Sequence, residues 1–114
     1  MTSFYHNPRC SKSRQALALL EARNIAPTII LYLENPPDAR QLKAVLKKLK
    51  LNARDVLRTG EEEYKALGLD NPQQTETALI AAMCQHPRLI ERPIFINGDK
   101  AVIGRPPENV LEIV

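Results

Sequence analysis

The chain has few cysteines, few aromatic residues and no long apolar run, and each shortage excludes a class of protein. Its 114 residues include two cysteines, too few for a disulfide scaffold and without metal-ligand spacing around them. Aromatic residues make up 4% of the chain, which argues against nucleic acid as a partner. No segment resembles a signal peptide or approaches the length of a membrane span. We therefore expect a cytoplasmic protein with reduced thiols, no membrane association and no metal.

The rest of the composition is that of one ordinary domain. Hydrophobic residues make up 44% of the chain, enough for a real core, and no internal repeat is present, so we expect a single domain over residues 1–114. The net charge of +3 suits an anionic small molecule or an acidic protein partner. The lysines at 47, 48 and 50 lie on an amphipathic pattern and are interpreted as a solvated helix face.

The first third of the chain predicts a βαβ unit. A short strand is expected over residues 2–6, an amphipathic helix over about 11–24 and a second strand over 28–33. The second strand is a nearly continuous apolar run, which indicates burial on both faces, as in parallel sheets. These lengths fit two parallel strands joined by a crossover helix.

A helical insertion follows. Asp38 and Gln41 form a capping-box pattern at the start of a helix with strong apolar periodicity. Further helical segments are expected around residues 52–55, over 61–67 and over 75–86.

The chain then returns to strand character. Two strands, 94–96 and 101–103, are expected around a tight reversal at Asn97-Gly98, followed by an amphipathic turn at 110–113. The order β-α-β, inserted helices, β-β-α is that of a thioredoxin-like α/β fold with a mixed sheet.

Cys10 has the strongest chemical context in the chain. It follows a bend at Asn7-Pro8 and directly precedes the first helix, so orphan N–H groups and the helix dipole should converge on its sulfur. Arg9, Lys12 and Arg14 add three cations. These features favour the thiolate and would also attract an oxyanion. The alternative is an inert, buried cysteine. The context favours a nucleophile beside an anionic substrate.

Two common cysteine mechanisms each require a residue that this chain lacks. The second position of a Cys-x-x-Cys pair holds Ser13, which excludes a dithiol mechanism at this site, and the arginine of a phosphatase signature is replaced by Ala16. Ser13 either donates a hydrogen bond to the Cys10 thiolate or is an ordinary first-turn serine. His6 either tunes the thiolate, orients the loop or is structural. Cys84 is interpreted as a core or semi-buried residue, with a resolving cysteine as the minority view.

Three arginines stand in unusual settings. Arg92 and Arg105 lie at the ends of the expected hairpin that should be close together, and Arg58 lies at a helix edge. Arginine forks match tetrahedral oxyanions, so a converging cluster is a reasonable hypothesis. The sequence leaves open whether the Arg92-Pro93 bond is cis.

The segment from Tyr5 to Cys10, followed by Ser13-Arg14, resembles the active-site start of the glutaredoxin-coupled arsenate reductases of the ArsC family. The similarity continues in order along nearly the whole chain. It includes Leu57-Arg58, residues 64–69, Gln85-His86-Pro87, residues 90–94, Gly104-Arg105-Pro106 and Val110-Leu111.

This resemblance implies a thioredoxin-like fold and a one-cysteine mechanism. Cys10 would attack arsenate to form a thioarsenate, glutathione would attack that adduct, and glutaredoxin would reduce the resulting mixed disulfide. Arsenite is the implied product, and no bound cofactor is implied. The implied oxyanion ligands are Arg58, Arg92 and Arg105. The implied supporting residues are His6, Asn7, Ser13 and Arg14.

Two other functions fit the same fold. One is a Spx-type regulator that binds RNA polymerase, and the other is a glutathione-dependent oxidoreductase acting on protein mixed disulfides. Spx-type regulators usually carry Cys-x-x-Cys and need not keep the arginine trio. Ser13 and the three arginines therefore favour the reductase.

Overall fold

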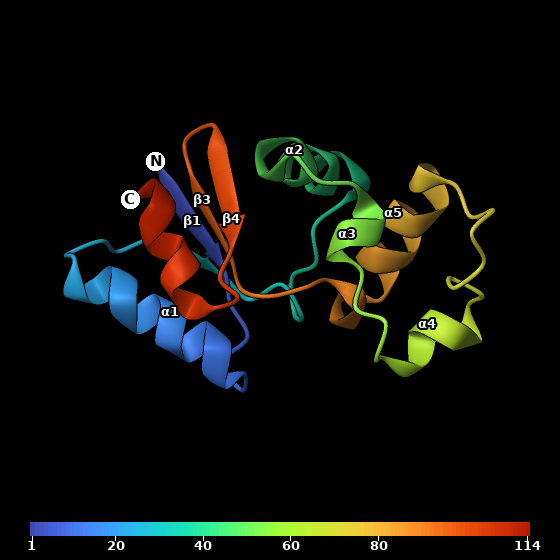
Figure 1. Cartoon of the computed structure of the whole chain (residues 1–114), viewed down its shortest axis with the longest axis horizontal. Coiled ribbons are helices and arrows are strands. Elements are labelled where there is room, and N and C mark those ends of the chain that lie inside the picture. Colours follow the sequence, from blue (N-terminus) through green and yellow to red (C-terminus); the bar gives the residue numbers. More distant parts are fainter. The chain divides into compact units, whose positions relative to one another are not determined.

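The computed structural model describes all 114 residues and divides into two compact units (Figure 1). The first, called the sheet unit here, comprises residues 1–35 and 92–114. The second, called the helical unit, comprises residues 36–91. The helical unit is thus the insertion expected between the second strand and the hairpin. The single domain over 1–114 stays a prediction.

The sheet unit contains a four-stranded mixed sheet in the order β2-β1-β3-β4. β1 (Thr2–Tyr5) pairs in parallel with β2 (Thr28–Ile30) and antiparallel with β3 (Ile94–Asn97). β3 pairs antiparallel with β4 (Lys100–Ile103). The predicted βαβ start and closing hairpin are confirmed.

The prediction that the second strand is buried on both faces is wrong. β2 has three residues and forms an edge of the sheet, and Ile29 is 42% exposed. The apolar run leaves the sheet after Ile30, because the N–H groups of Glu34 and Asn35 both bond to the carbonyl of Leu31 and form a turn.

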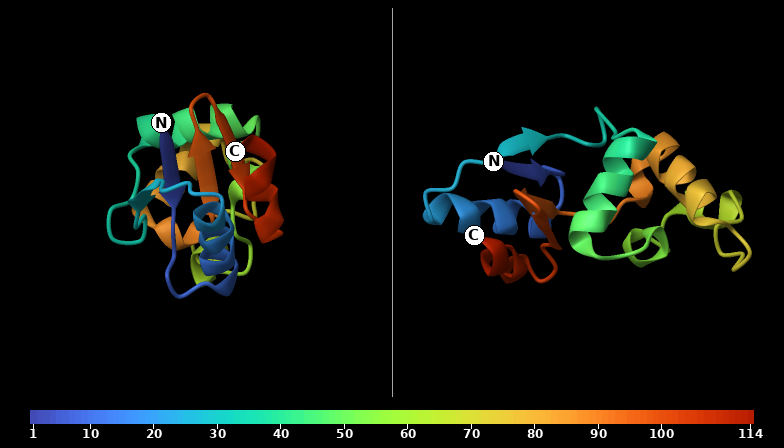
Figure 2. Two further views of the ribbon diagram at one scale, coloured as in Figure 1. Left: turned by 90° about the vertical axis from the view of Figure 1, so that its left-hand side faces the viewer. Right: turned by 90° about the horizontal axis from the view of Figure 1, so that it is seen from above.

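Two helices cover one face of the sheet (Figure 2). They are α1 (Ser11–Ala22), which ends two residues before the predicted boundary, and the 3₁₀ helix η2 (Pro107–Ile113), at the expected amphipathic turn. Apolar side chains from the two helices and the central strands form the core of this unit. Its fully buried members are Phe4, Ala16, Leu20, Phe95 and Val110. Full burial of a large apolar side chain, such as Phe4, Leu20 or Phe95, typically contributes about 1.5–3 kcal/mol to stability.

The hairpin is arranged so that both of its open ends carry an arginine. Asn97 pairs with Lys100, so the tight connection is Gly98–Asp99, one residue later than predicted, and Gly98 has a φ of +63°. The Arg92–Pro93 and Arg105–Pro106 peptide bonds are both cis. Gly104 lies against Pro93, since a Cβ at Gly104 would stand 2.8 Å from the Pro93 Cγ. Only glycine permits this close approach.

The helical unit follows the predicted order of segments. α2 (Ala39–Leu49) begins with the predicted capping box, in which Asp38 accepts from the Gln41 N–H and Gln41 accepts from the Asp38 N–H. The remaining helices are α3 (Ala53–Val56), α4 (Glu62–Ala66), α5 (Glu76–Gln85) and the 3₁₀ helix η1 (Pro87–Leu89). None of the helices in the chain has the length and apolar composition needed to cross a membrane.

Candidate active site

Cys10 is the N-cap residue of α1, as the sequence predicts. Its backbone is extended, with φ −94° and ψ 122°, and its carbonyl accepts from the Arg14 N–H at 3.0 Å. Its own N–H donates to the Asn7 carbonyl at 3.0 Å and closes a tight turn. The residue is 8% exposed and its thiol is free. The sulfur therefore lies where the unpaired N–H groups of the first helical turn point.

The environment lowers the pKa of the Cys10 thiol. Burial by itself raises the pKa, but the Ser13 N–H, the Arg92 guanidinium and the Lys12 N–H act on the sulfur and together reverse that effect. The charge of Arg92 lowers the pKa further. The thiolate is thus stabilised by helix N–H groups, as expected, and by an arginine from the hairpin.

Arg92 and Arg105 meet at the sulfur. The Arg105 Nη2 donates to the Cys10 Sγ at 3.7 Å, and its Nε donates to the Arg92 carbonyl at 2.8 Å. The predicted closeness of the two hairpin ends is confirmed. Their role as oxyanion ligands stays a prediction, and the sheet unit supplies the planar guanidinium donors that such a role requires.

The Ser13 hydroxyl bonds to His6 rather than to the thiolate. Its Oγ lies 2.7 Å from the His6 Nδ1 and accepts from the Asn7 N–H at 3.1 Å. The hydroxyl, which can both donate and accept, therefore joins the His6 ring to the backbone of the turn before Cys10. Of the two roles left open for Ser13, the structure shows neither: its backbone N–H acts on Cys10 and its side chain holds His6.

His6 is held neutral at neutral pH. Burial lowers its pKa, the Arg14 charge lowers it further, and Glu21 opposes the shift. The ring is 8% exposed. The Arg14 Nη1 also donates to the Pro8 carbonyl at 2.9 Å, and the Asn7 Oδ1 accepts from the Arg9 N–H at 3.1 Å. The predicted supporting residues thus form one hydrogen-bonded frame around the turn that carries Cys10.

Arg58 belongs to the helical unit and is paired there with two carboxylates. Its Nη1 lies 2.9 Å from the Glu91 Oε1 and its Nε lies 3.4 Å from the Glu61 Oε2. Its backbone N–H donates to the Leu89 carbonyl at 2.8 Å. Arg58 and Glu61 are three positions apart, on either side of the turn that precedes α4. The pair with Glu91 joins residues 33 positions apart, which no local pattern reveals.

Cys84 lies on α5, partly buried, as expected for a semi-buried residue. Burial raises the pKa of its thiol, and the Asp38 carboxylate raises it further. No group of three or more histidine, cysteine or carboxylate side chains is placed to hold a metal ion. Cys10 is therefore the thiol whose surroundings favour reactivity.

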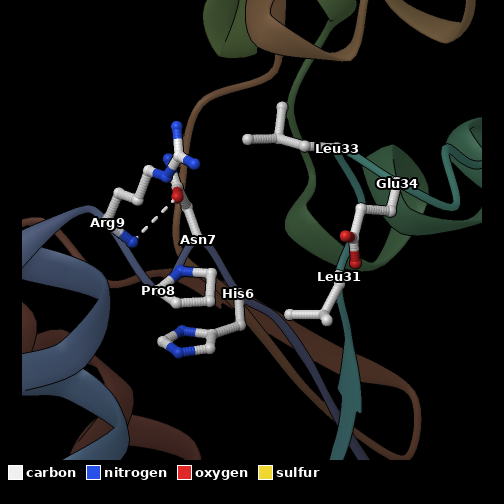
Figure 3. Close-up of a pocket in the computed structure, with 7 residues that line it drawn as sticks. All are labelled: His6, Asn7, Pro8, Arg9, Leu31, Leu33 and Glu34. Carbon is white, nitrogen blue, oxygen red and sulfur yellow. Dashed lines mark hydrogen bonds between the residues drawn. The ribbon is translucent and has the colours of Figure 1, made fainter.

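A cavity of about 310 Å³ opens beside the Cys10 turn, and sequence reasoning missed it (Figure 3). Residues 6–9 form one wall. Leu31, Leu33 and Glu34, from the turn after β2, form the other. The only signal for this cavity in the sequence was the apolar run that we interpreted as a buried strand.

The sequence model of the ArsC family matches residues 5–113 of the chain. An arsenate reductase of Haemophilus influenzae is 53% identical over 111 residues, which cover 96% of each chain. An arsenate reductase of Neisseria meningitidis serogroup A is 51% identical over 107 residues, covering 93% of this chain and 92% of the relative. The solved structure of an arsenate reductase from Vibrio cholerae superposes with a TM-score of 0.96, at 52% identity, covering 99% of this chain and 97% of the other. These likenesses confirm the predicted thioredoxin-like fold.

Proposed function

Because the chain belongs to the ArsC family, we propose that it reduces arsenate to arsenite with Cys10 as the nucleophile. The observation that carries the proposal is the Cys10 thiol at the start of α1, with a lowered pKa and two guanidinium groups donating to its sulfur. The relatives named arsenate reductase support arsenate as the oxyanion.

The arginines solve an electrostatic problem of this reaction. Arsenate is an anion at neutral pH and repels a thiolate, so the site must offset both charges before sulfur can approach arsenic. Arg92 and Arg105 already lie at the sulfur and would bind the arsenate oxygens. The assignment of Arg58 as a third ligand rests on the family resemblance alone, since Arg58 pairs with Glu61 and Glu91 in the helical unit.

The proposed chemistry uses one protein thiol and one thiol from solution. The Cys10 thiolate attacks arsenic, an As–O bond breaks, and the departing oxygen leaves as water after protonation. The thiolate of glutathione then attacks the Cys10 sulfur. An S–S bond forms, and the As–S electron pair stays on arsenic, which is reduced from As(V) to As(III) and leaves as arsenite. Glutaredoxin attacks the glutathione sulfur and releases the Cys10 thiolate.

The same proposal explains why Ser13 is sufficient at the position of a second cysteine. Its side chain holds His6 and the Asn7 N–H, so it fixes the loop, and the resolving thiol comes from glutathione. The electrons come from thiols in solution, so the reaction needs no bound cofactor. We place it in the cytoplasm, where glutathione and glutaredoxin are kept reduced.

The test is an assay of NADPH oxidation with glutathione, glutaredoxin and glutathione reductase, run with and without arsenate. We expect arsenate-dependent oxidation by the wild type and none by Cys10→Ser. A wild-type protein that reduces a glutathione mixed disulfide but shows no arsenate dependence would instead be a thiol oxidoreductase. Co-purification with RNA polymerase, together with no arsenate turnover, would identify a regulator.

A further inference from the structure

The cavity beside the Cys10 turn carries opposite charges on its two walls. Arg9 extends from the wall of residues 6–9, and Glu34 stands on the other wall (Figure 3). Both residues are exposed, and neither forms a salt bridge. Each charge is therefore available to a ligand that carries the complementary one.

The space between these charges is apolar. Leu31 and Leu33 line the wall next to Glu34, and Leu33 is 39% exposed. Pro8 lines the opposite wall. His6 adds no charge at neutral pH, because burial lowers its pKa. The cavity thus favours a small molecule with an ammonium group at one end, a carboxylate at the other and a neutral middle.

The cavity and the nucleophile share a structural element. The turn closed by the Cys10 N–H and the Asn7 carbonyl supplies three lining residues, Asn7, Pro8 and Arg9. A ligand held between the walls therefore lies beside the turn that carries the sulfur. The cavity is distinct from the guanidinium pair at the thiol, since neither Arg92 nor Arg105 lines it.

We propose that this cavity is the glutathione subsite. The inference rests on the proposed function and adds the location of the second thiol. Glutathione carries an ammonium and an α-carboxylate on its γ-glutamyl end, a second carboxylate on its glycine end and its thiol between them. The ammonium binds Glu34 and the glycine carboxylate binds Arg9 as a bidentate partner, which leaves the thiol in the middle, on the side of the Cys10 turn. The step it performs is the attack on the Cys10 sulfur described above.

The first test measures binding without chemistry. S-methylglutathione, whose sulfur cannot react, is titrated into the wild type while backbone amide shifts are followed by NMR. We expect shifts concentrated at residues 6–9 and 31–34, and weaker binding by Glu34→Gln. The matched control is Glu112→Gln, because Glu112 is an exposed carboxylate of the same unit that does not line the cavity. Absence of binding, shifts concentrated elsewhere or equal affinity in both variants would overturn the assignment.

The second test measures kinetics. Glu34→Gln should raise the KM for glutathione about two- to fivefold, the range typical of one exposed ion pair, and leave the KM for arsenate unchanged. Glu34→Lys, whose side chain repels the ammonium, should raise the KM for glutathione further. 2-Mercaptoethanol lacks both charged ends of glutathione. When it drives single-turnover arsenite formation, the wild type and Glu34→Gln should therefore form arsenite at equal rates.

The two tests separate the failure of this inference from the failure of the proposed function. If the wild type binds S-methylglutathione in the cavity but reduces no arsenate, the proposed function is wrong and the cavity remains a glutathione site. If the wild type reduces arsenate while Glu34→Gln and Glu34→Lys leave the KM for glutathione unchanged, the subsite is wrong and the reductase proposal stands.

Discussion

Cys10 and Cys84 are the two thiols of the chain, one in each unit, and burial acts on both in the same direction. In each case desolvation is the largest influence and raises the pKa. At Cys10 two backbone N–H groups and the Arg92 guanidinium reverse the shift, whereas at Cys84 the Asp38 carboxylate reinforces it. Burial therefore does not decide which thiol reacts; the donors that face the sulfur decide it.

The position of each cysteine on its helix explains the difference. Cys10 is the N-cap of α1, where N–H groups lack intrahelical acceptors, while Cys84 lies in the last turn of α5. The hairpin then adds the arginines that α5 lacks. A thiolate site in this fold thus needs a helix start and a cationic partner brought from a distant part of the chain.

Replacing each cysteine with serine should give the largest difference in activity between the two sites. Cys10→Ser should reduce arsenate turnover to the background rate, because no other thiol of lowered pKa is available to attack arsenic. Cys84→Ser should keep most of the activity. The coupled NADPH assay measures both, and circular dichroism confirms folding. A folded Cys84→Ser protein without activity would contradict the one-cysteine mechanism.

Arg92→Ala should produce the next largest effect. Removing one donor of an oxyanion site typically costs about 10²–10³ in rate. The same change should raise the pKa of the Cys10 thiol, because it removes a hydrogen bond and a charge that lower it. Arsenate turnover and the pH dependence of Cys10 alkylation measure the two consequences. Arg23→Ala is the matched control, since Arg23 is an exposed arginine of the same unit. Equal losses in both variants would exclude a specific role for Arg92.

Alkylation by iodoacetamide sharpens the comparison without any substrate. Reactivity follows the thiolate fraction, so it falls as the pH falls through the pKa of each thiol. Since the pKa of Cys10 is lowered and that of Cys84 is raised, Cys10 should stay reactive at a pH where Cys84 no longer reacts. At a pH below both pKa values, each unit of separation between them gives about a tenfold difference in thiolate fraction. Peptide mass spectrometry after timed labelling provides both rates. Equal rates at pH 7 would refute the assigned environments.

Ser13→Ala should have the smallest effect on the thiol and a clear effect on stability. The variant leaves the His6 Nδ1 and the Asn7 N–H without their partner, which costs about 1–3 kcal/mol of unfolding free energy. The pKa of Cys10 should change little, because Ser13 acts on the sulfur through its backbone N–H. Urea denaturation and alkylation kinetics measure these two quantities. A large shift in the alkylation profile with unchanged stability would show that the hydroxyl acts on the thiolate directly.

Local signals made much of this site predictable. The bend before Cys10 and the start of α1 are encoded by adjacent residues, and the closeness of Arg92 and Arg105 follows from pairing two strands in a hairpin. The capping box at Asp38 is likewise a pattern of four residues. In each case the physical cause lies within one element or one turn.

The features that the sequence did not predict depend on the order of strands or on distant partners. The exposure of Ile29 follows from the place of β2 at the edge of the sheet, which its composition does not specify. The bond between Ser13 and His6 crosses from α1 to the end of β1, and the pairing of Arg58 with Glu91 spans the helical unit. Such contacts are set by tertiary packing, so no local period encodes them.

If glutathione resolves the arsenate adduct of Cys10, the mixed disulfide should accumulate on this cysteine when glutaredoxin is withheld. The protein is incubated with arsenate and glutathione, quenched with acid and analysed by intact-mass and peptide mass spectrometry. We expect one glutathione per chain, bound to Cys10, in an amount that depends on arsenate. An adduct that forms equally without arsenate, or that lies on Cys84, would contradict it.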